Sequence, residues 1–285
     1  MDATDVQRVG VVGCGLMGSG IVEVAARAGC TVTFVTGSDE LVAAGFQRIH
    51  ASLDRAVERG KLEAADREAI LERIDGATSL GALGDADLVI EAATEDLEAK
   101  LAIFRELDGA TKPDIVLASN TSSIPIVELA LATSRPDRVV GMHFFNPPPV
   151  MALIELIPAL TTSDGTMAFA AAVAERLGKT VVRAKDHAGF IVNRLLIPFL
   201  NDAARLYDEG FATREDIDTA ISLGLGHPMG PLALADLIGI DTCVSVARIL
   251  FDEFGDARYA PPPVMKRMAA AGHLGRKSGR GFYEY

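Results

Sequence analysis

A glycine-rich loop set between an apolar strand and a helix is the feature that most constrains the fold of this chain. Residues 9–12 form a continuous apolar run, which is typical of a strand buried on both faces of a parallel sheet. The sequence Gly13-Cys14-Gly15-Leu16-Met17-Gly18 follows at once, and residues 19–28 continue with apolar spacing close to that of a helix. Residues 31–35 then supply a second, β-branched strand. This order predicts a strand–loop–helix–strand unit whose loop binds a dinucleotide.

Each glycine of the loop has a separate physical task in this interpretation. Gly13 permits the tight turn, Gly15 lets the pyrophosphate approach the backbone, and Gly18 allows the helix to pack closely on the strand. The backbone N–H groups of the loop, which also contains Leu16 and Met17, and the helix dipole would hold the anion. The alternative is that the glycines serve only a tight turn. The position of the loop, directly after a strand and before a helix, favours the dinucleotide.

The rest of the pattern predicts an α/β fold with a doubly wound, Rossmann-type sheet, followed by an all-helical domain. Further strands are expected at residues 88–90, 115–118, 139–142, 153–157 and 180–183, with helices at 97–107 and 126–132 between them. Two helices at 39–60 and 63–74 form an inserted hairpin beside the sheet. Beyond residue 186 the strand signals nearly vanish, and helices are expected at 189–208, 214–222 and 232–254. We therefore predict a dinucleotide-binding domain over 1–186 and a helical substrate and dimerisation domain over 187–285.

Composition excludes several other classes of protein. The chain has 285 residues and a net charge of −12, which argues against a nucleic-acid binder because such a protein needs a basic face. The longest run without Asp, Glu, Lys or Arg, residues 219–235, is too short for a membrane span, and the N-terminus has acidic residues where a leader would be basic. Three cysteines without a CxxC pair indicate a reducing compartment, so a cytoplasmic protein is expected. No metal-ligand spacing is present, and no metal site is predicted.

The end of the second strand leaves the choice of cofactor open. NAD-binding folds usually place Asp or Glu there to grip the ribose hydroxyls, whereas this chain has Thr36. Without that carboxylate the 2′-phosphate of NADP is no longer repelled, so NADP becomes admissible. No Lys or Arg occurs between Arg27 and Arg48 to bind that phosphate, and Asp39 and Glu40 are expected in the first turn of the next helix. NAD is therefore the predicted cofactor, with reduced selectivity.

Polar side chains follow two of the predicted strands at the edge where ligands of such sheets bind. Ser119-Asn120-Thr121-Ser122-Ser123 comes after one strand, and His143-Phe144-Phe145-Asn146-Pro147 comes at the end of another. A histidine in this place is a candidate general base. Glu155 is flanked by apolar residues in the next strand, and a buried carboxylate there could orient the imidazole and stabilise its charged form. The alternatives are a packed structural histidine and an exposed strand glutamate.

The first helix of the inserted hairpin carries a row of basic side chains. Arg48, Ser52, Arg55 and Arg59 are spaced by four, three and four residues and therefore share one face. Arginines on one face of an acidic protein could bind the phosphates of an anionic ligand. The alternative is an ordinary solvated helix face.

Four segments together resemble the 3-hydroxyacyl-CoA dehydrogenase family, most closely its short bacterial 3-hydroxybutyryl-CoA dehydrogenases. They are S-N-T-S-S (119–123), H-F-F-N-P (143–147), G-H-P-M-G-P (226–231) and L-G-R-K-S-G-R-G-F-Y (274–283), and they span nearly the whole chain. The resemblance implies reversible oxidation of an (S)-3-hydroxyacyl-CoA to a 3-ketoacyl-CoA with a nicotinamide cofactor. It also implies a homodimer formed through the C-terminal domain.

The resemblance further assigns roles to individual residues. His143 matches the catalytic base and Glu155 its paired carboxylate, while Ser122 and Asn193 match groups that hydrogen-bond the reacting oxygen. Asn193 follows the predicted domain boundary, which is sensible if the second domain contributes to catalysis.

Other positions match the binding residues of the family. Glu95 and Lys100 match residues near the nicotinamide and its ribose, Asn120 and Asn146 line the same cleft, and Ser52 and Arg59 match coenzyme A contacts; Arg55 is added from the helical spacing. Thr36 departs from the family, which usually has an acid there. That departure concerns the cofactor preference and not the type of reaction.

Two other functions are compatible with parts of the same pattern. The same chemistry could act on a hydroxyacyl group held by an acyl carrier protein, or on a free hydroxy acid. A non-catalytic nucleotide-binding relative would be expected to lack part of the constellation, whereas Ser122, His143, Glu155 and Asn193 are all present.

Overall fold

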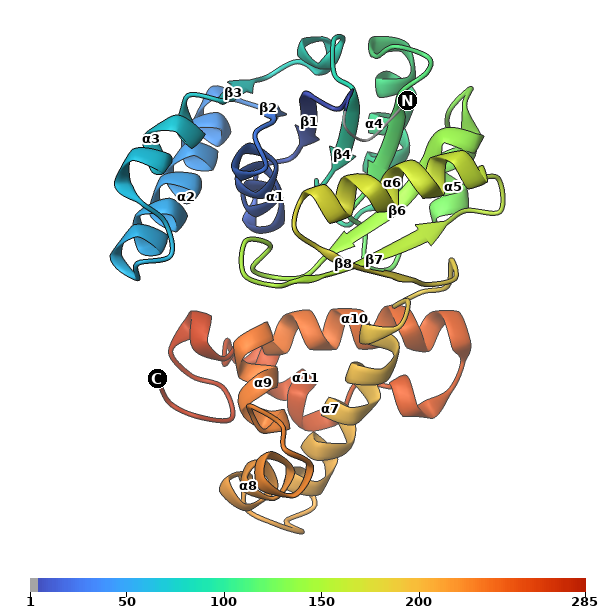
Figure 1. Cartoon of the computed structure of the whole chain (residues 1–285). Coiled ribbons are helices and arrows are strands. Elements are labelled where there is room, and N and C mark those ends of the chain that lie inside the picture. The colour runs from blue at the N-terminus through green and yellow to red at the C-terminus, as the bar shows by residue number, and fades with distance from the viewer. Residues whose placement is uncertain (1–4) are drawn as a thin grey trace. The chain divides into compact units, whose positions relative to one another are not determined.

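The protein consists of two compact units in a computed structural model that describes residues 5–285. The first unit comprises Met1–Asp186 and the second His187–Tyr285. Figure 1 shows that the first contains the sheet and the second is built of helices. The predicted fold class, a doubly wound sheet followed by a helical region, is confirmed.

The described part of the first unit forms one eight-stranded sheet with the order β3-β2-β1-β4-β5-β6-β7-β8. All neighbouring strands are parallel except β6 and β7, which are antiparallel. The chain order reverses between β1 and β4, and this is the switch point at which such sheets bind their ligands. The strands are β1 (Arg8–Val12), β2 (Thr31–Val35), β3 (Ile74–Ala77), β4 (Leu88–Glu91), β5 (Val116–Ser119), β6 (Val139–Phe144), β7 (Leu153–Pro158) and β8 (Thr180–Arg183).

Helices cover both faces of the sheet because its strands are apolar on both faces. Helices α1 and α6 pack on one face against side chains such as Val11, Ile90 and Met142, and α4 and α5 lie on the other (Figure 1). The bounds are α1 (Leu16–Arg27), α4 (Leu97–Ala110), α5 (Ile126–Leu131) and α6 (Asp164–Arg176), with short 3₁₀ turns η2 (Leu80–Leu83) and η3 (Pro136–Arg138). Helix α6 was not predicted.

The inserted hairpin consists of α2 (Asp39–Glu58) and α3 (Ala64–Leu71). Ser38 caps α2 by accepting a hydrogen bond from the Leu41 N–H group, and acidic residues in the first turn complement the helix dipole. Ile49 and Leu53 are fully buried and fix the helix to the domain. The predicted helix at 63–74 is too long at its C-terminal end, because Ile74 begins β3 and pairs with Val32.

The second unit contains α7 (Val192–Asp208), α8 (Arg214–Leu225), α9 (Pro231–Ile238), α10 (Ile240–Phe254) and α11 (Pro263–Ala270), with 3₁₀ turns η4 (Ala257–Tyr259) and η5 (Arg276–Ser278). The expectation of one helix over 232–254 is wrong. Gly239 interrupts it with a φ of 108°, which lies outside helical backbone and which a residue with a side chain rarely adopts. Among residues 5–285, no helix is long and apolar enough to span a membrane.

Candidate active site

The glycine-rich loop has the geometry that a dinucleotide requires. Gly13 has a φ of +89°, and its N–H group donates to the Val35 carbonyl at 2.8 Å. A Cβ on Gly18 would lie 1.9 Å from the Gly13 carbonyl oxygen, so only glycine permits this close packing. A Cβ on Gly15 would meet nothing within 4 Å, which leaves open space above the backbone there. The geometry at the three glycines therefore fits the three separate tasks described for this fold.

The start of α1 is suited to an anion. Gly15 is the N-cap and offers no side chain to the first N–H groups, and the first turn contains no acidic residue. The free N–H groups and the positive end of the helix dipole therefore face the space above Gly15. Leu16 is 66% exposed at this end, whereas Met17 is half-buried against the core. The residues present fit the pyrophosphate of a dinucleotide.

Thr36 lies directly after β2, where the adenine ribose is held in this fold. Its hydroxyl donates to the Ser38 carbonyl at 3.2 Å, so the oxygen can still accept a hydrogen bond from a ribose hydroxyl. Asp39 and Glu40 occupy the first turn of α2, as the sequence predicted. The next arginine after Thr36 in the sequence, Arg48, donates to the Cys14 carbonyl at 3.4 Å.

His143 and Glu155 form a buried pair on neighbouring strands. The antiparallel register sets them directly opposite each other on the same face of the sheet. The Nδ1 atom of His143 lies 2.7 Å from Oε2 of Glu155, with the two residues 6% and 0% exposed. A carboxylate at this distance fixes the orientation of the ring and stabilises its protonated form. Phe145 tilts against the imidazole with ring centroids 4.7 Å apart.

Asn120 joins the two polar segments. Its N–H group donates to the Glu91 carbonyl at 2.7 Å, and its side-chain oxygen accepts the Phe144 N–H at 2.8 Å. The amide thus connects the end of β5 to the strand that carries His143. Asn146 is exposed and precedes Pro147 through a cis peptide bond.

Glu95 organises the segment that contains Ser122. Its Oε1 atom accepts hydrogen bonds from the Thr121 hydroxyl at 2.6 Å, the Ser122 N–H at 2.8 Å and the Ser123 hydroxyl at 2.9 Å. The Ser122 hydroxyl also lies 3.2 Å from this atom. Burial raises the pKa of Glu95, but the charge of Lys100 and these hydrogen bonds outweigh burial, and the pKa ends below its usual value.

Lys100 is almost completely buried, 1% exposed, and its ammonium group donates to Glu91 Oε1 at 2.6 Å. It lies 3.5 Å from Glu95 Oε2. Glu91 was not among the predicted site residues. The signal that could have found it is its place at the end of β4, the same kind of position that identified the segment after β5.

The loop that follows His143 is held by a buried lysine that the sequence analysis also missed. The Lys179 ammonium donates to the Pro148 carbonyl at 2.6 Å and the Met151 carbonyl at 2.9 Å. Burial lowers the pKa of Lys179. Pro148 packs on Gly20 of α1, where an added Cβ would lie 2.6 Å from the proline ring. This loop is therefore fixed to the helix that begins at the cofactor loop.

The basic face of α2 is available to solvent. Arg55 and Arg59 are exposed and Ser52 is half-buried. Neither of these arginines forms an ion pair within the described residues. Their charges are therefore accessible to an anionic ligand.

Asn193 belongs to the second unit, where it lies half-buried in the first turn of α7. The other three predicted catalytic residues belong to the first unit.

The two motifs of the C-terminal part, residues 226–231 and 274–283, have clear structural roles. Asp218 accepts the Leu232 and Ala233 N–H groups at 2.8 and 2.9 Å and so caps α9 after Gly230.

Asp236 holds the C-terminal motif in the same way. It accepts the N–H groups of Phe282 and Tyr283, each at 2.9 Å. A Cβ on Gly281 would lie 1.9 Å from Asp236 Oδ1, so this position requires glycine. Both motifs therefore support the helical unit.

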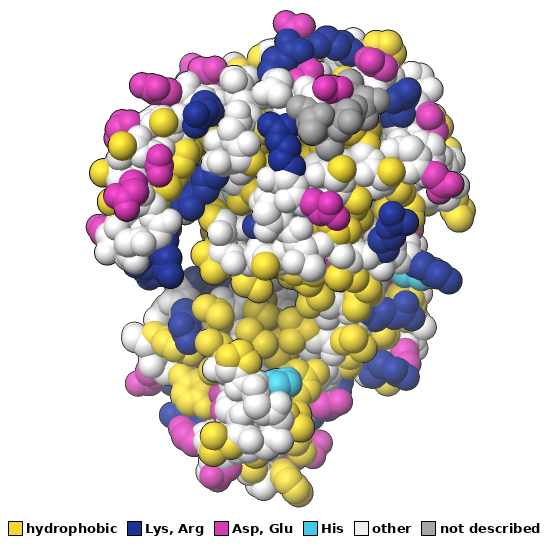
Figure 2. Space-filling model, viewed as in Figure 1, with side chains coloured by type: hydrophobic (Ala, Val, Ile, Leu, Met, Phe, Trp, Pro, Cys, Tyr) yellow, Lys and Arg dark blue, Asp and Glu magenta, His cyan; other side chains and the backbone are white. Residues whose placement is uncertain are grey.

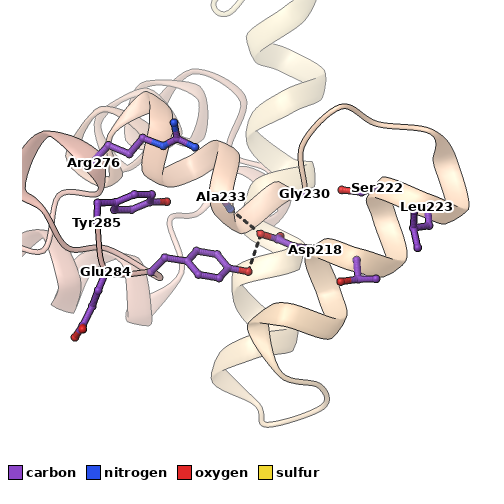
Figure 3. Close-up of a pocket in the computed structure, with 10 residues that line it drawn as sticks. Asp218, Ser222, Leu223, Gly230, Ala233, Arg276, Glu284 and Tyr285 are labelled. Atoms are coloured by element: carbon purple, nitrogen blue, oxygen red, sulfur yellow. Dashed lines mark hydrogen bonds between the residues drawn. The ribbon is translucent and has the colours of Figure 1, made fainter.

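A pocket of about 480 Å³ lies between the segment that Asp218 holds and the C-terminal segment that Asp236 holds (Figure 3). Asp218 bonds the Ala233 backbone and the Tyr283 hydroxyl there, the latter at 2.9 Å, and Arg276 stacks on the ring of Tyr285. None of the predicted catalytic or cofactor-binding residues lines this pocket.

Known proteins are similar to this chain over nearly its whole length. Two family models match: 3-hydroxyacyl-CoA dehydrogenase, NAD binding domain, over residues 8–187, and 3-hydroxyacyl-CoA dehydrogenase, C-terminal domain, over residues 189–285. A 3-hydroxybutyryl-CoA dehydrogenase of Mycobacterium tuberculosis is 53% identical, with 98% of this chain and 99% of that protein covered.

Solved structures show the same fold. The crystal structure of FadB2 from M. tuberculosis matches with a TM-score of 0.96 at 52% identity, covering 98% of this chain and 99% of that one. That of (S)-3-hydroxybutyryl-CoA dehydrogenase PaaH1 from Ralstonia eutropha matches with a TM-score of 0.92 at 48% identity, covering 99% of both chains.

Proposed function

Because the chain belongs to the 3-hydroxyacyl-CoA dehydrogenase family, we propose that it interconverts (S)-3-hydroxybutyryl-CoA and acetoacetyl-CoA with NAD. The observation that carries the proposal is the buried His143–Glu155 pair, whose Nδ1 and Oε2 atoms are 2.7 Å apart. The pair lies at the edge of the sheet where β1 ends and the cofactor loop begins. A histidine oriented by a carboxylate is the group that removal of a hydroxyl proton requires.

NAD supplies the hydride acceptor when it is bound. His143 takes the proton of the substrate hydroxyl through Nε2, because Nδ1 is directed to Glu155. Glu155 stabilises the imidazolium that forms, since the two groups are shielded from water. In the reverse direction the protonated imidazole returns this proton to the ketone oxygen. General acid–base assistance of this kind contributes about 10²- to 10⁴-fold.

Ser122 and Asn193 orient the reacting oxygen in this proposal. Glu95 fixes the backbone of Ser122 through the hydrogen bond to its N–H group, which sets the direction of the hydroxyl. Asn193 contributes an amide from the helical unit, in the first turn of α7. Asn146 and Asn120 complete the polar lining near the ends of β5 and β6.

Ser52, Arg55 and Arg59 bind the coenzyme A phosphates. The support is their position on one exposed face of α2 and the absence of an ion pair at either arginine in residues 5–285. A positively charged face on a protein with a net charge of −12 also attracts an anionic substrate locally.

The protein acts as a homodimer through its helical unit. Figure 2 shows hydrophobic side chains gathered on that unit. Its exposed apolar residues include Leu195 (70%), Phe211 (77%), Leu223 (82%) and Leu225 (64%), and burial of such side chains is what a subunit interface would provide. The three buried, unpaired cysteines support a reducing location, the cytoplasm.

The test is the reduction of acetoacetyl-CoA by NADH, followed by the loss of NADH absorbance, with acetoacetate and an acetoacetyl carrier protein as competing substrates. We expect the highest kcat/KM with the CoA thioester and NADH, and a fall of at least about 10²-fold in His143→Gln. Activity confined to the carrier-bound or free substrate would refute the proposal. Light scattering of the same sample tests the dimer.

A further inference from the structure

A buried carboxylate that the mechanism does not use lies at the switch point of the sheet. Glu91 is fully buried at the end of β4 and accepts three hydrogen bonds. The donors are the Lys100 ammonium at 2.6 Å, the Ser119 hydroxyl at 2.6 Å and the Ala93 N–H at 2.7 Å. Buried ion pairs of this kind add little to stability, because burial of both charges costs about as much as their attraction gains.

The hydrogen-bond partners of Glu91 share one feature. The Ser119 oxygen accepts the Thr121 N–H at 3.2 Å, and its hydroxyl donates to Glu91. Ammonium and amide groups can only donate. All three partners of Glu91 are therefore donors, which is the arrangement a charged carboxylate requires.

A third charge belongs to the same cluster. The Glu95 Oε2 atom lies 3.5 Å from the Lys100 ammonium, while Oε1 faces the Ser122 segment. Its lowered pKa keeps this carboxylate ionised at neutral pH. Two carboxylates and one ammonium leave the Glu91–Lys100–Glu95 cluster with one net negative charge.

The cluster lies next to the place that the cofactor ring must occupy. Glu91 pairs in register with Val12 on one side, which precedes the cofactor loop, and with Ser119 on the other, which precedes the Ser122 segment. The adenine ribose is held near the end of β2, and the reacting carbon must be close to His143 on β6. The nicotinamide end therefore lies over β4 and β5. This step rests on the function proposed above.

We propose that the Glu91–Lys100–Glu95 cluster sets the relative affinity of the protein for the oxidised and the reduced dinucleotide. The nicotinamide ring carries one positive charge in NAD⁺ and none in NADH, so a net negative cluster favours NAD⁺. One unit of charge acting over about two strand spacings, roughly 10 Å, at an effective dielectric of about 20, changes the ratio of the two dissociation constants about tenfold.

Substitutions that change the cluster charge in opposite directions test this proposal. Glu91→Gln removes the net negative charge and should weaken NAD⁺ relative to NADH about tenfold, whereas Lys100→Met makes the cluster more negative and should strengthen NAD⁺ relative to NADH. The double variant Glu91→Gln/Lys100→Met restores one net negative charge and should return the ratio to the wild-type value. The readout is the dissociation constant of each dinucleotide from the full chain, measured by titration calorimetry.

The direction of each change separates charge from structural damage. Damage alone would weaken both dinucleotides in both single variants, and a ratio that moves the same way in the two, or by less than about twofold, overturns the proposal. Glu98→Gln is the matched control, because it removes an exposed charge from the same helix and should leave the ratio unchanged.

If either buried variant does not fold, Glu95→Gln decides the question. The side chain of Glu95 is 34% exposed, so its substitution is compatible with folding. NAD⁺ must then weaken relative to NADH, and an unchanged ratio overturns the proposal. Failure of the wild-type protein to bind either dinucleotide would instead refute the proposed function, and so the two failures are distinguishable.

Discussion

Glu155→Gln is the substitution that isolates the charge of the catalytic pair from its geometry. Glutamine has nearly the same shape as glutamate, and its side-chain oxygen can still accept the hydrogen bond that His143 Nδ1 makes at 2.7 Å. The orientation of the imidazole is therefore retained. Only the stabilisation of the imidazolium that forms during oxidation is lost.

The size of the effect follows from the burial of the pair. His143 is 6% exposed and Glu155 is not exposed, so water screens their attraction weakly. Unit charges about 4 Å apart at an effective dielectric of about 20 attract by about 4 kcal/mol. The amide dipole of glutamine replaces part of this, and we expect kcat for oxidation of 3-hydroxybutyryl-CoA to fall by about 10²- to 10³-fold.

The assay is the steady-state formation of NADH, with the dissociation constant of NAD⁺ measured on the same preparation. Affinity for NAD⁺ should fall by no more than about tenfold, because Glu155 lies on β7, two strand spacings from β5, and not beside the cofactor loop. Glu106→Gln, an exposed change on α4, is the control for a generic loss of one negative charge. A fall in kcat of less than about tenfold would show that Glu155 acts by position and not by charge.

Other changes test the cofactor loop, the basic helix face and the buried thiol. Gly15→Ala should fold normally but weaken NAD⁺ binding at least about tenfold by calorimetry, because its methyl group would fill the open space above the loop. Gly18→Ala should lower the free energy of unfolding by about 3 kcal/mol in urea titrations, because its Cβ would lie 1.9 Å from a backbone oxygen. Arg55→Gln with Arg59→Gln should raise KM for the CoA substrate several-fold at low salt and less at high salt, with a small change in kcat. Burial raises the pKa of Cys14 to about 12, so its thiol stays protonated at about pH 8, and mass spectrometry should find it unalkylated by iodoacetamide until the protein unfolds.

The sequence was sufficient where a local pattern determines the structure. The run from residue 9 to Gly18 predicted a strand, a turn and a helix that the structure confirms, because the glycines are required by backbone geometry at that point. The helix expected over 232–254 is wrong because an apolar stretch continues through Gly239 while the backbone turns there. Periodicity counts side chains and does not register a single residue with positive φ.

The residues that were missed depend on contacts between distant parts of the chain. Lys179 was missed because its partners are two backbone carbonyls about thirty residues away, and backbone groups leave no trace in a sequence pattern. Helix α6 was missed although Ser163 caps it through the Thr166 N–H, because its run of alanines gives weak amphipathic contrast. Tertiary packing, not local preference, decides both features.

The rule that polar residues at strand ends form the site was applied to one strand and not to another. It predicted His143 at the end of β6, and applied to β4 it would also have predicted Glu91. Glu91 was passed over because a single acid after an apolar strand has no partner nearby in sequence; its partner, Lys100, is one helical turn into α4. The buried charged residues then lie in two groups on different strands. In the proposed reaction the β6–β7 pair would act on the proton that leaves the substrate and the β4 cluster on the charge of the ring that gains the hydride, so each transfer would have its own buried charge.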